Sequence, residues 1–153
     1  MRPDLSALEW LTPLLTAKVL EAEEGAEPME VHGVALRTRT LSFPNRADAN
    51  LTVKVEVACL QLGALTVGFL PGEPFVEFQL RFREVLKPYP TLLVGYANGW
   101  TGYIPTQDAF ASGGYGVDLY PHDPPQYSRT MLPEGTGEGL LETLIAVARP
   151  RKV

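Results

Sequence analysis

Glu73 is the first residue whose setting suggests chemistry, because it directly follows the tight segment Leu70-Pro71-Gly72. The apolar run Leu65–Leu70 predicts a buried strand, and the pattern after Gly72 predicts a helix that begins at Glu73 and ends near Leu86. A helix N-terminus stabilises a carboxylate through its free N–H groups and its dipole. A carboxylate held there suits a metal ligand or a general base. On spacing alone, an ordinary first-turn glutamate is the stronger interpretation.

A second candidate is the segment Gly95–Thr106, which places aromatic side chains between glycines directly after a predicted strand. Such a segment could line a pocket for a small molecule. On these residues alone it is more often a tight loop whose aromatic rings cover the core.

The remaining metal-binding and nucleophilic residue types do not form a recognisable site. A catalytic zinc needs about three protein ligands, and here His32 and His122 are single and far apart in the sequence. His122 lies in a proline-rich stretch typical of a solvated turn. Cys59 lies on the apolar face of a predicted strand, which indicates a buried and unreactive thiol. The sequence contains no serine-hydrolase, phosphate-loop or dinucleotide motif.

The hydrophobic pattern predicts an α/β fold: a single domain over residues 1–153 with a mixed sheet, a central hairpin and flanking helices. The hairpin is formed by strands 51–62 and 65–70, and strand 91–96 lies beside it. The other predicted elements are an N-terminal helix over residues 5–19 that is either kinked or divided at Pro13, a strand over 29–43, a long irregular segment over 97–133, and a helix over 137–147 with Thr136 as N-cap.

Composition excludes several function classes. The chain has 153 residues, 45% of them hydrophobic, and a formal net charge of -5, so we expect a globular protein that does not bind nucleic acid. One cysteine allows no internal disulfide. No apolar run is long enough to span a membrane, and we see no secretory signal, so we expect a cytoplasmic protein.

Three motifs together resemble the C-terminal half of the catalytic domain of the neutral/alkaline non-lysosomal ceramidase family, and most of all its smaller bacterial relatives. They are Leu70–Phe75 (L-P-G-E-P-F), Gly95–Thr106 (G-Y-A-N-G-W-T-G-Y-I-P-T) and Phe110–Tyr115 (F-A-S-G-G-Y), and the resemblance extends over residues 51–147. The family consists of zinc amidohydrolases that cleave the N-acyl bond of ceramide, with a metal-bound water as the expected nucleophile.

The resemblance implies that Glu73 corresponds to a zinc ligand. Asn98-Gly99-Trp100 corresponds to a family segment N-x-Y whose tyrosine binds zinc, and tryptophan cannot do so. Phe110 replaces a tyrosine that contacts the scissile amide, whereas Tyr115 matches a family tyrosine. The candidate substrate-binding residues are Tyr115, Trp100, Phe110 and Asn98. The two zinc histidines and the active-site serine belong to a half of the family's domain that is missing here.

Two hypotheses follow from this pattern. In the first, the chain is inactive alone, and zinc binds only with a second chain that carries the missing N-terminal half. In the second, the chain is a non-catalytic binding or assembly module, for example a homo-oligomer that buries the face once covered by that half.

Overall fold

The computed structural model describes residues 6–149, and their contacts divide the chain into two units, one up to Glu30 and one from Val31 onward. In the first unit, helix α1 (Ser6–Glu24) is continuous, with Pro13 inside it and no buried residue. The interpretation of two separate helices is therefore wrong. The prediction of one domain over residues 1–153 stays a prediction.

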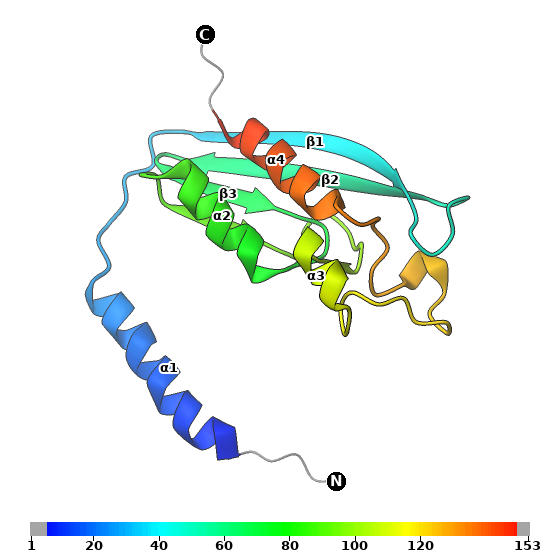
Figure 1. Cartoon of the computed structure of the whole chain (residues 1–153). Helices are drawn as coiled ribbons and strands as arrows, with labels where there is room; N and C mark the ends of the chain where they lie inside the picture. Colours follow the sequence, from blue (N-terminus) through cyan, green and yellow to red (C-terminus); the bar gives the residue numbers. More distant parts are fainter. Residues whose placement is uncertain (1–5, 150–153) are drawn as a thin grey trace. The chain divides into compact units, whose positions relative to one another are not determined.

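The second unit is built on a four-stranded mixed sheet with the order β1-β2-β3-β5 (Figure 1). β1 (Val34–Pro44), β2 (Thr52–Leu62) and β3 (Leu65–Phe69) pair antiparallel, and β5 (Thr91–Val94) pairs parallel with β3. This confirms the predicted α/β class, the hairpin and the strand beside it. β3 is central because strands flank it on both sides, which agrees with its uniformly apolar sequence.

Helices α2 (Val76–Leu86) and α4 (Thr136–Ala148) lie on the same side of the sheet, where the core forms (Figure 1). Gly68 of β3 allows this close packing, because a Cβ there would lie 2.7 Å from the Cδ2 atom of Leu144. The core there includes alternate residues of β2 and the inner faces of the two helices: Val55, Val57, Cys59, Phe78, Phe82, Leu140, Leu141 and Leu144.

The predicted start of the last helix needs a small correction. Its N-cap is Gly135, which has a left-handed conformation with φ of 76°, and Thr136 is already helical and buried. Glycine adopts this conformation without steric cost, so the chain enters the helix through Gly135 and needs no side-chain cap.

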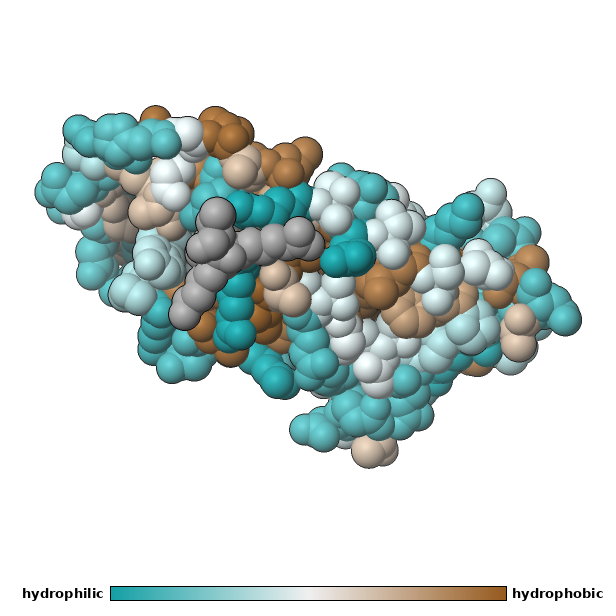
Figure 2. All heavy atoms as spheres, turned by 90° about the horizontal axis from the view of Figure 1, so that it is seen from above, coloured by the Kyte–Doolittle hydropathy of each residue, from teal (hydrophilic) through white to brown (hydrophobic). Residues whose placement is uncertain are grey.

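The opposite face of the sheet carries apolar side chains that no helix of this unit covers (Figure 1). We call it the open sheet face and define it by the cross-strand row Leu36–Leu60–Val67–Leu92, with Val34, Leu62 and Leu65 on one side of the row and Phe69 and Val94 on the other. Leu36 is 64% exposed and Leu92 is 53% exposed. In the space-filling view, hydrophobic residues reach the surface among hydrophilic ones (Figure 2).

The helix expected from Glu73 begins three residues later, which corrects the first sequence prediction. Glu73 and Pro74 form the short strand β4, which pairs parallel with β6 (Tyr103–Ile104). Proline disfavours the helical conformation for the residue before it, so Glu73 is extended and α2 begins only at Val76.

The predicted irregular segment 97–133 contains β6, the short helix α3 (Gln107–Ser112) and the 3-10 turn η1 (Pro125–Tyr127). Within residues 6–149, no helix is both long and apolar enough to cross a membrane.

Candidate functional site

Glu73 is held in place by backbone hydrogen bonds to the segment that contains β6. The N–H of Glu73 donates to the carbonyl of Gly102 at 2.9 Å, and the N–H of Phe75 donates to the carbonyl of Ile104 at 3.1 Å. These bonds fix the backbone on both sides of Glu73. Its side chain therefore projects from the two-stranded β4–β6 sheet.

The glycines of the two motifs allow this pairing to form. The N–H of Tyr96 donates to the carbonyl of Gly72 at 2.6 Å, and the Thr101 hydroxyl donates to the carbonyl of Pro71 at 2.6 Å. A Cβ on Gly72 would lie 2.5 Å from the carbonyl oxygen of Gly102, and one on Gly95 would lie 2.8 Å from the carbonyl oxygen of Gly72. Glycine is needed at these positions because three backbone segments meet there.

The carboxylate of Glu73 accepts a hydrogen bond from the Tyr96 hydroxyl. The Tyr96 ring stacks on Trp100, with 5.2 Å between ring centroids and an interplanar angle of 19°. Tyr96 and Asn98 both have positive φ values, 54° and 63°, which non-glycine residues rarely adopt. Strained backbone of this kind often lies at functional sites.

A second pair of tyrosines extends the cluster. Tyr103 lies opposite Glu73 in the β4–β6 pairing, and its ring meets Tyr115 edge-on with 5.5 Å between centroids. Hydrogen bonding to Tyr115, then burial and hydrogen bonding to Glu73, raises the pKa of Tyr103 far above its ordinary value. Hydrogen bonding to Glu73, then burial, raises the pKa of Tyr96. Both hydroxyls therefore stay protonated at neutral pH, and the Tyr96 hydroxyl donates its one proton to Glu73.

Arg129 lies at the outer edge of this cluster. Its guanidinium carbon is 5.4 Å from the ring centroid of Tyr115 and 4.0 Å from that of Tyr120, both within cation–π range. Its Nε atom is 3.4 Å from a carboxylate oxygen of Asp123. We call Glu73, Tyr96, Trp100, Tyr103 and Tyr115 the glutamate–tyrosine cluster.

The structure brings some of the predicted site residues together and leaves others apart. Trp100 is linked to Glu73 through Tyr96, on which its ring stacks. Tyr115 is linked to Glu73 through Tyr103. Phe110 lies on α3, where the guanidinium carbon of Arg46 is 4.8 Å from its ring centroid. Asn98 is exposed on the turn after β5. Neither has a ring contact or side-chain hydrogen bond to the cluster among residues 6–149.

Cys59 lies in the core, as its position on the strand predicts. It is fully buried, and burial raises the pKa of its thiol, while the charge of Arg37 opposes this shift. A neutral buried thiol is a poor nucleophile and a poor metal ligand.

The donor atoms around Glu73 do not fit a zinc centre by themselves. Within the described part of the chain, no three His, Cys, Asp or Glu side chains gather closely enough to hold a metal ion. The cluster offers one carboxylate and neutral phenol groups, and the indole of Trp100 has no lone pair to donate. Zinc requires about three good ligands, so the described residues around Glu73 do not form such a set by themselves.

Tyr96 and Tyr103 are the cluster residues that the sequence did not single out. Tyr103 reaches Glu73 through the parallel pairing of two-residue strands, 30 positions apart along the chain. Such short strands have no detectable period. The available signal was the glycine spacing around Tyr96 and Tyr103, which indicated a tight loop without showing what it enclosed.

Comparison with known proteins gives a structural likeness. No family model and no curated protein matches the chain. The fold is similar to part of the crystal structure of neutral ceramidase from Pseudomonas aeruginosa, with a TM-score of 0.49 and 18% sequence identity over 63% of this chain. The match spans 15% of the length of that protein.

Proposed function

We propose that this chain is a ceramidase-like module that is catalytically inactive alone and contributes Glu73 and its tyrosines to an active site completed by a second chain. The observation that carries the proposal is the half-buried Glu73, whose backbone is fixed by strand pairing and whose carboxylate accepts a hydrogen bond from the Tyr96 hydroxyl. The three motifs that resemble the ceramidase family meet in part at this point: Leu70–Phe75 supplies Glu73, Gly95–Thr106 wraps around it, and Tyr115 of the third motif contacts Tyr103.

The chemistry of the cluster agrees with an incomplete site. A tyrosine hydroxyl has one proton to donate, so Tyr96 can donate it to a substrate carbonyl or an oxyanion only by releasing the Glu73 carboxylate. Tyr115 is 69% exposed and Tyr96 is 62% exposed, so both side chains lie largely at the surface, where a partner or a ligand can contact them. However, residues 6–149 offer no general base beyond Glu73 at this point and no full set of metal ligands, so we assign no catalytic step to the chain alone.

The open sheet face supports the need for a partner. A four-stranded sheet with helices on one side is normally covered on an apolar second side, because exposed apolar surface is unfavourable in water. Contiguous exposed apolar patches of this kind mark interaction sites. We propose that the second chain covers this face and carries the histidines that Glu73 lacks.

Two measurements test this proposal. The purified chain alone is expected to release no product from a fluorescent short-chain ceramide and to hold far less than one zinc ion by elemental analysis. With a second chain that carries the missing half, co-expressed from a neighbouring gene, we expect stoichiometric zinc that is lost in Glu73→Ala and retained in the surface control Glu77→Ala. Zinc binding that is unchanged by Glu73→Ala would refute the assigned role.

A second candidate function is a homo-oligomeric assembly module, which the open sheet face favours independently of Glu73. Here the face would pack against a second copy. Light scattering of the pure chain would then give a dimer or larger assembly, and Leu36→Lys would dissociate it. Thr40→Lys is the matched control, because Thr40 lies on the same side of β1 beyond the apolar rows. A monomeric wild-type chain would exclude this function.

A further inference from the structure

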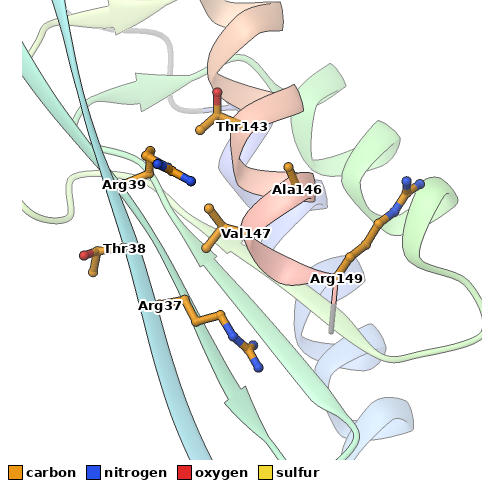
Figure 3. A pocket seen from close by; sticks show the side chains of 7 residues that line it. All are labelled: Arg37, Thr38, Arg39, Thr143, Ala146, Val147 and Arg149. Carbon is orange, nitrogen blue, oxygen red and sulfur yellow. The ribbon is translucent and has the colours of Figure 1, made fainter. Parts of the chain in front are cut away.

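A cavity of about 490 Å³ lies between β1 and the C-terminal part of α4, on the helix-covered side of the sheet (Figure 3). Arg37 and Arg39 line one wall, and Thr143, Ala146 and Val147 of α4 line the other. The two arginines are two residues apart on β1, opposite Cys59 and Val57, so both project toward α4. None of the residues of the glutamate–tyrosine cluster lines this cavity.

The charge of this cavity is unusual for its position. Further along the same side of β1, Leu41 and Phe43 pack against the core, yet Arg37 and Arg39 occupy the equivalent positions here. Neither arginine forms an ion pair or a side-chain hydrogen bond with any residue from 6 to 149. Among the described residues no Asp or Glu lines the cavity, although the whole chain is acidic with a net charge of -5. Guanidinium groups present a planar set of donors that matches carboxylate and phosphate oxygens.

A second cavity of about 430 Å³ adjoins the first, because Arg37 and Arg149 line both. It extends toward the C-terminal end of α2, where Ala64, Val85, Leu86 and Ala148 supply much of its wall. In Figure 3 the Arg149 side chain points away from Arg37 and Arg39, toward α2. The two cavities together form a groove with Arg37 and Arg39 at one end; its other end near α2 has a mostly apolar wall that also includes Lys87 and Arg149.

We propose that this groove binds an anionic amphiphile, namely a carboxylate or phosphate monoester carried on a short aliphatic chain. The anionic group binds between Arg37 and Arg39, and the chain lies along the apolar cavity. This site is independent of the proposed role of Glu73. The competing explanation is that the two arginines only offset the partial negative charge at the C-terminus of α4. In that case the groove has no affinity for anions, which an experiment can decide.

The test is isothermal titration calorimetry of the full chain with four probes: octanoate, octyl phosphate, inorganic phosphate and octanol. Octanoate or octyl phosphate is expected to bind more tightly than inorganic phosphate and octanol, and the better of the two identifies the anionic group. Arg37→Gln and Arg39→Gln should each weaken that binding by about tenfold, because each removes charge-assisted hydrogen bonds. Ala64→Glu should also weaken it, by placing a carboxylate in the apolar part.

Arg81→Gln is the control, because Arg81 is exposed on α2 and lines neither cavity. It removes the same charge and is expected to leave the affinity unchanged, and circular dichroism of each variant verifies the fold. Binding that falls equally in Arg81→Gln and Arg37→Gln would overturn the proposal. So would octanol that binds as tightly as octanoate, inorganic phosphate that binds as tightly as octyl phosphate, or no binding of any probe.

Discussion

Gly102→Ala tests the packing that positions Glu73. Gly102 has φ of +73°, and a Cβ there would lie 2.2 Å from the carbonyl oxygen of Arg129. A left-handed alanine costs about 1 kcal/mol or more, and overpacking against a backbone atom adds roughly 1–3 kcal/mol because no side-chain rotation relieves it. We expect the free energy of unfolding to fall by about 3 kcal/mol in total.

Gly114→Ala is the matched control. Gly114 also has a positive φ, +99°, but a Cβ there would meet no atom within 4 Å. This variant carries the backbone strain without the clash, so its expected loss is about 1 kcal/mol.

The assay is urea unfolding followed by circular dichroism, with both variants compared with the wild type. The reasoning requires Gly102→Ala to be less stable than Gly114→Ala by about 2 kcal/mol. Equal stability of the two variants would show that the 102–104 segment does not pack closely on the chain around Arg129, and the pairing that holds Glu73 would have to be revised.

Three further predictions concern titration, reactivity and helix packing. Because the Glu73 carboxylate raises the pKa of Tyr96, Glu73→Ala should bring tyrosinate absorbance to lower pH in an alkaline titration. The stabilising effect of this contact should be complete below about pH 10 and disappear as the pH rises through the raised pKa of the folded state; an unchanged titration curve would contradict the contact. Cys59 is fully buried and its thiol has a raised pKa, so it should react with a thiol reagent only after the chain is unfolded in urea. Rapid reaction of the folded chain would contradict the burial of Cys59 in the core. In α4, Gly137→Ala should lower the midpoint of urea unfolding, because a Cβ there would lie 2.5 Å from the Phe78 ring. Gly139→Ala, whose Cβ would meet nothing within 4 Å, should stabilise the helix by roughly 0.5–1 kcal/mol. The opposite order of stabilities would refute the packing of α4 on α2.

The sheet and the later helices could be predicted from sequence because their signals are local. Val53, Val55 and Val57 alternate with polar residues, which defines β2 and its buried side without knowledge of its neighbours. The start of α2 was predicted wrongly because the apolar spacing continues back to Phe75, while Pro74 and the pairing with β6 keep Glu73 extended. That pairing depends on residues distant in sequence, which no local pattern reveals.

The candidate site was predictable only in part, for the same reason. Glu73 and Trp100 stand out through their motifs, but their connection through the Tyr96 hydroxyl and ring depends on the fold. Phe110 was expected near the substrate because of its place in a motif, and in the structure it lies on α3 and contacts Arg46 of the loop between β1 and β2. Its role in substrate binding stays a prediction. Arg37 and Arg39 gave no signal, because arginines on an edge strand are common and only the cavity beside α4 sets them apart.

The most direct test of the central claim is the zinc content of the chain purified alone, in the absence of chelators. Because the cluster offers Glu73 without two further strong ligands, we predict far less than one zinc ion per chain. One tightly held zinc ion per chain, lost in Glu73→Ala, would contradict the claim that a second chain must complete the site.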